Sequence, residues 1–228
     1  LLEEGIRIGI ATGRGKSVRK SMQEALPNDV WKQIIVGYYN GAECKPLYDN
    51  SSPDGTDKVC LELEPIVDIF YSNRYLKSLA KVTVRKKQIS LEPKQIWNLN
   101  VLWGLTCELI SNLGETGIKV LMSTRSIDVL APGVSKRNVI DVVLSSHSKK
   151  NHKAVLCIGD QGKWPGNDSE LLSEAYSLSV NTVSSNLSTC WNIAPAGYKG
   201  SQATMFYLKC LVPEKGRFRF QLACGRRK

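Results

Sequence analysis

The sequence predicts an α/β fold in which a parallel sheet flanked by helices carries a smaller inserted α+β module. Apolar residues form predicted strands at 6–12 and 34–39. Between them, residues 17–26 place their apolar side chains at helical spacing, and Pro27 ends the pattern. A strand, a helix and a strand in this order are typical of a parallel sheet covered by helices.

The middle of the chain, residues 43–124, has the pattern of a separate α+β module. Expected strands at 59–64, 81–90 and 118–123 alternate there with a helix opened by Pro65 and an amphipathic helix at 93–113. The α/β alternation then resumes with a strand at 126–130, a helix at 134–146, a strand at 153–158 and a helix at 168–178. We therefore expect a core from residues 1–42 and 125–214, an insert at 43–124 and a tail at 215–228.

Size and composition exclude several protein classes. With 228 residues, 42% apolar and 23% charged, the chain can bury one or two ordinary cores and is neither disordered nor fibrous in composition. No apolar run approaches the ~20 residues that cross a bilayer, so no membrane partner is expected, and no signal peptide or transit sequence opens the chain. The seven cysteines form no CxxC pair, and with only His147 and His152 beside them we expect no zinc site and a cytoplasmic location.

The net charge of +10 is unevenly distributed. The insert carries equal numbers of acidic and basic residues, whereas residues 215–228 contain several basic residues and no acid. A basic tail binds polyanions weakly or is simply solvated. It lacks the regular basic and aromatic interleaving of a groove that follows a nucleic-acid strand, so nucleic acid is not the expected partner.

Two carboxylates mark the expected functional edge of the sheet. Asp160 follows the apolar run 154–158 and Gly159, so it lies at the carboxyl end of a parallel strand, where ligands of open α/β sheets bind. Asp168 follows shortly after, directly before the helix expected at 168–178. The alternative is structural, with Asp168 as a helix N-cap and Asp160 as a turn residue.

Two further features point to the same edge. Thr12, Gly13 and Arg14 place a hydroxyl and free backbone N–H groups at a strand-to-helix turn, a natural corner for a phosphate group. Lys136 stands in the first turn of the next core helix, where the helix dipole gives a cation no advantage. Together with two acids, these residues suit a phosphate and a divalent cation, and the hard oxygen ligands favour Mg²⁺.

Four segments, in order, resemble the later motifs of haloacid dehalogenase-like (HAD) phosphatases. They are Ile10–Arg14, Tyr39–Ala42, Pro132–Lys136 and the run from Gly159 to Leu172. The likeness is greatest to the Cof-type, sucrose-phosphate-phosphatase and trehalose-phosphate-phosphatase branches, which carry an α+β cap between the second and third motifs. It covers about residues 1–180 and implies a Rossmann-like HAD core with an inserted cap.

The resemblance implies a role for each matching residue. Thr12 is expected to hydrogen-bond the transferring phosphoryl group, and Lys136 to neutralise it. Asp160 is expected to ligate Mg²⁺, with Asn167 and Asp168 completing or supporting the metal shell. Asn40 and Gly41 match the turn that leads into the cap and approaches the substrate. The expected phosphate or substrate contacts in the matching motifs are Thr12, Gly13, Arg14, Asn40 and Lys136.

The last motif departs from the family pattern, because its two acids lie closer together in the family than Asp160 and Asp168 do here. The extra residues, including Lys163 and Trp164, should bulge at the mouth of the site. We expect these two side chains to contact substrate through charge and ring stacking. The alternative is an ordinary loop with a packed Trp.

The second departure concerns the family's first motif, an apolar strand followed by Asp-x-Asp-Gly. In the family this motif supplies the aspartate that attacks phosphorus, and it precedes the strand that bears Thr12. The only similar run here, Asp54-Gly55-Thr56, follows Ser-Ser-Pro and is expected to be a turn. The sequence thus resembles a chain that lacks its N-terminal nucleophile motif.

The leading hypothesis is an Mg²⁺-dependent HAD-type phosphatase acting on a sugar phosphate or a similar small phosphomonoester, incomplete at its N-terminus. One alternative is a non-catalytic phosphate- or polyanion-binding protein on the same scaffold. Another is a phosphotransferase that resembles phosphomannomutases. The sequence contains no signal for an oligomeric state.

Overall fold

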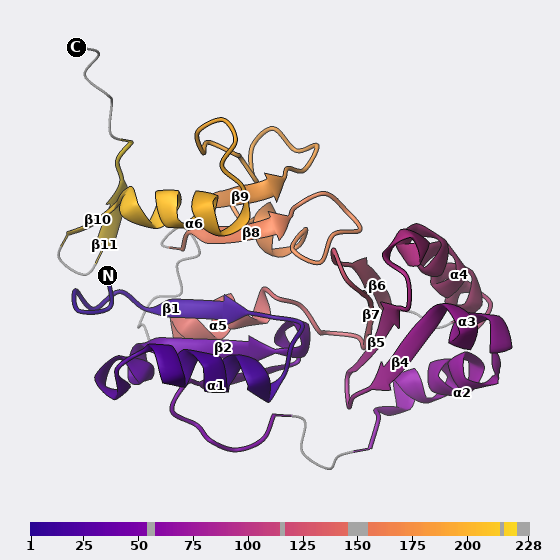
Figure 1. Cartoon of the computed structure of the whole chain (residues 1–228). Helices are drawn as coiled ribbons and strands as arrows, with labels where there is room; N and C mark the ends of the chain where they lie inside the picture. The colour runs from indigo at the N-terminus through magenta and orange to yellow at the C-terminus, as the bar shows by residue number, and fades with distance from the viewer. Residues whose placement is uncertain (54–57, 115–116, 146–154, 215–216, 223–228) are drawn as a thin grey trace.

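A computed structural model describes residues 1–53, 58–114, 117–145, 155–214 and 217–222. The chain forms two lobes with parallel strands and an insert beside them (Figure 1). The Asp54-Gly55-Thr56 run, both histidines and most of the basic tail lie outside the described residues.

The first lobe is a three-stranded sheet in the order β1-β2-β3. Its elements are β1 (Ile8–Ala11), α1 (Lys16–Ala25), η1 (Asn28–Gln33), β2 (Ile34–Tyr38), η2 (Tyr39–Gly41) and β3 (Glu43–Pro46). Strands β1 and β2 are parallel, as the strand–helix–strand pattern predicts, and β3 returns antiparallel along β2. Thus β3 belongs to this sheet, although its residues follow the expected boundary at 42.

The insert is a four-stranded antiparallel sheet covered by helices. Its elements are η3 (Leu61–Leu63), α2 (Glu64–Ser72), α3 (Arg74–Leu79), β4 (Ala80–Val84), β5 (Gln88–Pro93), η4 (Ile96–Asn98), α4 (Leu99–Ser111), β6 (Lys119–Met122) and β7 (Ile127–Leu130). The strand order is β4-β5-β7-β6, so the sheet extends past residue 124. One apolar cluster fills the space beneath the helices, with Phe70, Leu91, Leu102 and Ile127 fully buried.

The second lobe is built on the parallel pair β8–β9. Its elements are β8 (Cys157–Gln161), η6 (Leu171–Ser173), β9 (Ser177–Thr182), α6 (Gly200–Lys209), β10 (Leu211–Glu214) and β11 (Arg217–Phe220). Tyr207 on α6 is fully buried against β9, and its hydroxyl donates a hydrogen bond to the carbonyl oxygen of Ser179 at 2.9 Å. Strands β10 and β11 form a separate antiparallel pair.

Helix α5 (Asn138–Ser145) joins the two lobes. One face packs closely on the first sheet, where a Cβ on Gly9 or Gly37 would overlap the Val139 side chain. The other face contributes Ile140 and Leu144 to the cluster that contains Cys157 of β8. Two parallel pairs therefore share one supporting helix, yet they form separate sheets.

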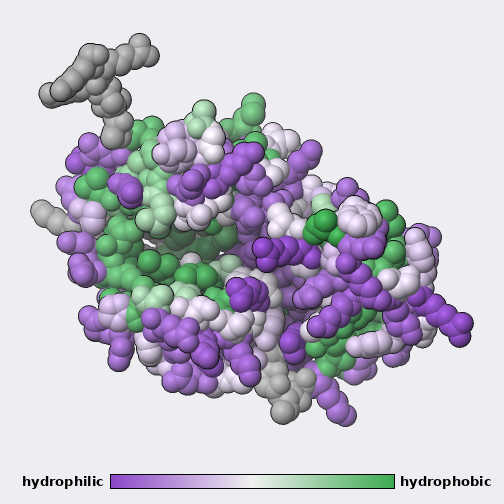
Figure 2. All heavy atoms as spheres, viewed as in Figure 1, coloured by the Kyte–Doolittle hydropathy of each residue, from purple (hydrophilic) through white to green (hydrophobic). Residues whose placement is uncertain are grey.

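Within the described residues, no strand pairs with the facing edges of these two sheets. The N–H of Thr12 donates to the carbonyl of Gly37 on β2, so alternation along the strand turns the N–H groups of Gly9 and Ala11 to the opposite edge. On β8, the N–H of Cys157 donates toward β9, which turns the N–H of Ile158 away from β9. Figure 2 shows a hollow lined with apolar side chains between the two lobes.

Some predicted elements differ in the structure. The strand expected at 59–64 is the short η3, and the strand expected at 81–90 is two strands, because the N–H of Arg85 donates to the carbonyl of Gln88 and closes a turn. The helix expected at 168–178 is also wrong. There the Ser177 hydroxyl hydrogen-bonds the carbonyls of Leu172 and Glu174, which ends the short η6 and begins β9.

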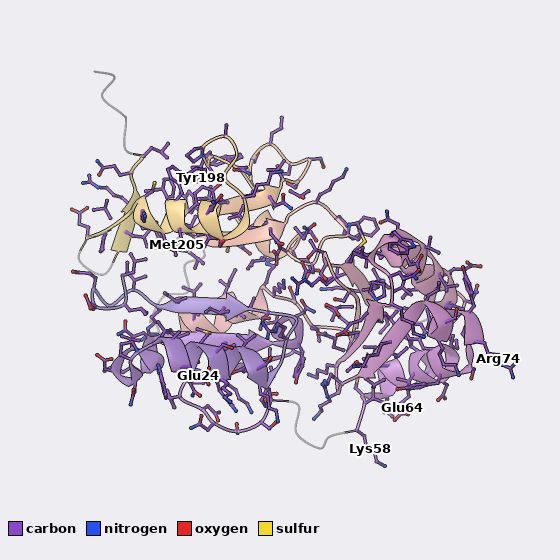
Figure 3. The ribbon with its side chains drawn as sticks, viewed as in Figure 1. Glu24, Lys58, Glu64, Arg74, Tyr198 and Met205 are labelled. Carbon is purple, nitrogen blue, oxygen red and sulfur yellow. The ribbon has the colours of Figure 1, made fainter. Side chains whose placement is uncertain are left out.

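The outer surface is polar, and charged side chains such as Glu24 on α1 and Arg74 on α3 project into solvent (Figure 3). No helix within the described part of the chain is long and apolar enough to cross a membrane. The described cysteines are free thiols: Cys44, Cys60, Cys107, Cys157, Cys190 and Cys210.

Candidate active site

Lys136, Asp160 and Asp168 form one compact group at the carboxyl end of β8. The Lys136 ammonium and Asp168 Oδ1 are 2.6 Å apart, and both side chains are buried. Asp168 Oδ2 accepts hydrogen bonds from the backbone N–H groups of Asp160 at 2.8 Å and Gln161 at 3.4 Å. Asp168 therefore fastens the loop back onto the end of its own strand and brings Lys136 beside Asp160.

Gly159 makes this close approach possible. A Cβ at that position would lie 2.7 Å from Asp168 Oδ2, so any larger residue would displace the carboxylate. Lys136 itself lies in the turn before α5, which begins at Asn138, and not in the first helical turn as expected. The ammonium is held there by charge pairing across the two lobes, because Asp168 comes from the second lobe.

The two carboxyl groups have opposite pKa shifts. Burial, together with hydrogen bonding to Asp168 and the charge of that residue, raises the pKa of Asp160 to about 6. Burial alone would also raise the pKa of Asp168, but the Lys136 ammonium and its hydrogen bonds outweigh burial, and the pKa lies below its usual value. The lowered pKa of Asp168 favours its charged form, whereas the raised pKa of Asp160 favours its protonated form.

The oxygen atoms of this group suit a hard cation. Asn167 Oδ1 is buried and has no hydrogen-bond partner in the described structure, which is costly unless a ligand occupies it. Asp160 adds a half-buried carboxylate close by in the chain, whereas both oxygens of Asp168 already accept hydrogen bonds. Among the described residues no set of three His, Cys, Asp or Glu side chains surrounds a point, so the fit rests on carboxylate and amide oxygens.

The turn after β1 forms the second part of the site. The N–H of Arg14 donates to Thr12 Oγ1 at 3.0 Å, and the Arg14 guanidinium donates to Ser17 at 3.3 Å. Helix α1 begins after Gly15, and no side chain caps its first backbone N–H groups. This corner offers a hydroxyl, a guanidinium and backbone donors to an anion.

Asn40 joins this corner to the insert. It is fully buried in the left-handed conformation (φ 58°), and its N–H donates to the Thr12 carbonyl at 2.7 Å. Its side-chain amide donates to Gln88 Oε1 at 3.0 Å and to Asp128 Oδ2 at 3.1 Å. The next residue, Gly41 (φ +83°), has no room for a Cβ, which would overlap the Ser135 carbonyl.

Gln88, Ser90 and Asp128 are site residues that the sequence reasoning missed. They form the polar face of the insert sheet, and Ser90 Oγ donates to Asp128 Oδ1 at 2.8 Å. Burial raises the pKa of Asp128, while Ser90, Asn40 and the Lys136 charge oppose that rise. The sequence signal was a lone carboxylate within β7, whose four residues are all buried.

Lys163 and Trp164 lie on the insert side of the site. The Trp164 ring packs edge-to-face on Trp103 of α4, with ring centroids 5.7 Å apart, and remains 67% exposed. The main chain that follows hydrogen-bonds Met122 of β6. The expected contact of Lys163 and Trp164 with substrate stays a prediction.

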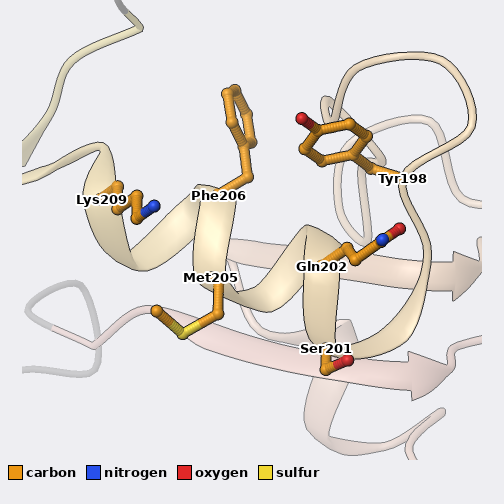
Figure 4. Close-up of a pocket in the computed structure, with 6 residues that line it drawn as sticks. All are labelled: Tyr198, Ser201, Gln202, Met205, Phe206 and Lys209. Carbon is orange, nitrogen blue, oxygen red and sulfur yellow. The ribbon is translucent and has the colours of Figure 1, made fainter.

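A separate surface depression of about 430 Å³ lies on α6 (Figure 4). Its lining is Tyr198, Ser201, Gln202, Met205, Phe206 and Lys209. It contains none of the predicted site residues, and Lys209 is its single charged side chain.

Comparison with known proteins identifies the fold. An N-terminally truncated IMP-nucleotidase from Plasmodium falciparum superposes with a TM-score of 0.53 at 16% identity over 79% of this chain and 58% of its own. The fold is haloacid dehalogenase-like. A haloacid dehalogenase-like hydrolase from Bacteroides thetaiotaomicron (TM-score 0.52, 16% identity) covers 79% of this chain and 78% of its own. The predicted α/β HAD-like fold is thus confirmed.

A third neighbour is the C-terminal domain of trehalose-6-phosphate phosphatase from Candida albicans, with a TM-score of 0.51 at 14% identity over 82% of this chain and 72% of its own. The chain spans 58% of the Plasmodium nucleotidase, which is less than two thirds of that protein's length. No protein-family model matches the sequence, and no curated protein sequence matches it.

Proposed function

We propose that this chain is part of an Mg²⁺-dependent phosphatase of the HAD type that hydrolyses a small phosphomonoester in the cytoplasm. The observation that carries the proposal is the Lys136–Asp168–Asp160 group, a buried cation held between an anion and a half-buried carboxyl at a strand end. The HAD-like fold of phosphatases with known structures supports it.

Each site residue has a defined task in this proposal. Thr12 and the N–H groups that follow it bind the phosphoryl oxygens, and Lys136 neutralises their charge. Asp160 and Asn167 hold Mg²⁺ through oxygen atoms, and Asp168 orients Lys136. When bound, Mg²⁺ supplies charge stabilisation to the phosphoryl group.

The attacking carboxylate comes, in this proposal, from an Asp-x-Asp strand that precedes residue 1 and lies between β1 and β8. The open edges at Gly9, Ala11 and Ile158 support this position, since each turns an N–H toward the space between the lobes. Helix α5 already packs on both neighbouring sheets, so a parallel strand there would make one continuous sheet. Its carboxyl end would reach Thr12 and Asp160 together.

The leaving group is a polyol in this proposal. Gln88, Ser90 and Asp128 of the insert lie beside the turn that contains Gly13, where they hydrogen-bond one another and the Gly13 carbonyl. The substrate class that we propose is a sugar phosphate, as the resemblance to sugar-phosphate phosphatases implies.

The test is phosphate release by the full-length protein from a panel of sugar phosphates and nucleoside monophosphates. We expect Mg²⁺-dependent release that is fastest with a sugar phosphate and falls at least ~100-fold in Lys136→Met. Lys81→Met, at an exposed position on β4, is the matched charge control. Equal release by Lys136→Met and the wild type would contradict the proposed site.

A further inference from the structure

Residues 162–167 form a turn that contacts the edge of the insert sheet through a single bridge residue, Gly166. The N–H of Met122 donates to the carbonyl of Pro165 at 2.8 Å, and the N–H of Asn167 donates to the carbonyl of Met122 at 3.0 Å. These two bonds flank Gly166, which forms a parallel bridge with Met122. Strand β6 is the outer strand of its sheet, so this segment pairs with one position of that edge, at Met122.

An aromatic contact reinforces the pairing. Trp164 meets Trp103 of α4 at an interplanar angle of 82°, the edge-to-face arrangement that aromatic rings favour. The rest of the Trp164 ring is exposed, so its contact with Trp103 is what holds the ring against the insert.

The segment has little freedom between the insert and the acids. The N–H of Gly166 donates to the Lys163 carbonyl at 2.7 Å, which closes a tight turn. A Cβ on Gly166 would overlap the carbonyls of Gln161 and Lys163. A shift of β6 must therefore displace Asn167, whose N–H is bonded to it, and Asp168 beside it.

A second tie lies close by. The Lys119 ammonium at the start of β6 pairs with Glu170 at 2.6 Å, and Ser135 Oγ donates to Glu170 at the same distance. Strand β6 thus contacts the second lobe at two points, through Met122 before Asp168 and through Lys119 after it. The extra residues between Asp160 and Asp168 are the ones that reach β6.

We propose that residues 162–167 are a clasp through which the insert positions the Mg²⁺-binding loop, with Met122, Trp103 and Trp164 as positioning residues. The role of Asn167 rests on the proposed function, whereas the clasp itself does not. Because coupling is reciprocal, Mg²⁺ binding tightens the clasp, and a closed clasp strengthens Mg²⁺ binding.

The first test is hydrogen exchange of the Met122 and Asn167 amides in the full-length protein without Mg²⁺. Trp164→Ala should lower the protection of both amides about 2- to 12-fold, the equilibrium equivalent of one aromatic pair. Trp164→Phe should restore it, and Trp97→Ala, an exposed tryptophan of the same insert, should leave it unchanged. Unaltered protection in Trp164→Ala would overturn the clasp, whatever the protein's activity.

The second test adds Mg²⁺ alone and follows the same amides. In the wild type, protection at Met122 should rise with that at Asn167, by up to ~100-fold at 100 times the dissociation constant. Trp164→Ala should bind Mg²⁺ more weakly in calorimetry by the factor found in the first test. Mg²⁺ binding that protects Asn167 and leaves Met122 unchanged would overturn the coupling, whereas a wild type that binds no Mg²⁺ would refute the proposed metal site and leave the first test to decide the clasp.

Discussion

The insert and the two-lobed core are both built from short strands but differ in how they bury apolar surface. The insert has one continuous sheet over one cluster, in which Leu63, Phe70, Leu91 and Ile127 are fully buried. The core distributes its buried residues over three smaller clusters, and its strands form three separate sheets. The difference teaches that the insert is one continuous packing unit, whereas the two parallel pairs of the core are separate sheets that share helix α5.

The largest expected effect is at the ion pair that joins the two lobes. Lys136→Met leaves the Asp168 carboxylate buried without its cation, which should cost about 3–5 kcal/mol in the free energy of unfolding. Urea unfolding would measure it, with Lys163→Met as the exposed control. Adding Asp168→Asn should recover part of the loss, and no recovery would contradict a charge-based explanation.

Truncation of one apolar side chain in each region separates the two modes of packing. Leu91→Ala in the insert should cost about 2–5 kcal/mol, because the side chain is fully buried. Ile158→Ala in the 228-residue chain should cost less than about 2 kcal/mol, since this residue of β8 is half-buried. In the full-length protein the Ile158 cost should approach that of Leu91, and equal costs in the 228-residue chain would remove the contrast.

The contact between insert and first lobe should be weaker than either interior. Gln88→Ala removes a hydrogen bond to the Gly13 carbonyl and leaves the Asn40 amide with one acceptor fewer. We expect a loss of about 1–3 kcal/mol. Thermal unfolding would measure it, with exposed Gln202→Ala on α6 as the control. An equal loss in both variants would show that the buried hydrogen bonds of Gln88 do not add to the free energy of unfolding.

The smallest effect is a pH dependence at Asp160. Its pKa in the folded protein is raised to about 6, so the protonated form is favoured by folding and stability falls as the pH rises from about 4 through 6. In EDTA, Asp160→Asn should flatten the melting temperature over this window and melt higher at pH 7. A steeper pH dependence in the variant would reverse the sign of our assignment.

The sequence predicted the parts of the site that local patterns encode. Asp160 lies near the end of β8 and Thr12 directly follows β1, so both are at the strand ends where the sequence pattern placed them, and their roles stay predictions. Gln88 and Asp128 were missed because their roles depend on sheet pairing between β5 and β7, far apart in the chain. The helix expected after Asp168 failed because the Ser177 hydroxyl competes for backbone carbonyls, an interaction that apolar periodicity does not register.

The contact partner of Trp164 shows the same limit. The sequence indicated that extra residues separate the two acids, but only the fold brings α4 and β6 to that loop. The role of an inserted segment depends on the residues that it contacts in the fold, and the local sequence does not contain that information.

The most direct test of the account is hydrogen exchange at the open edges of β1 and β8 in the full-length protein. If a strand that precedes residue 1 lies between them, the amides of Gly9, Ala11 and Ile158 should be as protected as those of β5, because each N–H then has a carbonyl partner. Exchange of these three amides at the rate of solvent-exposed strand edges would contradict a completed sheet, and with it the proposed source of the attacking carboxylate.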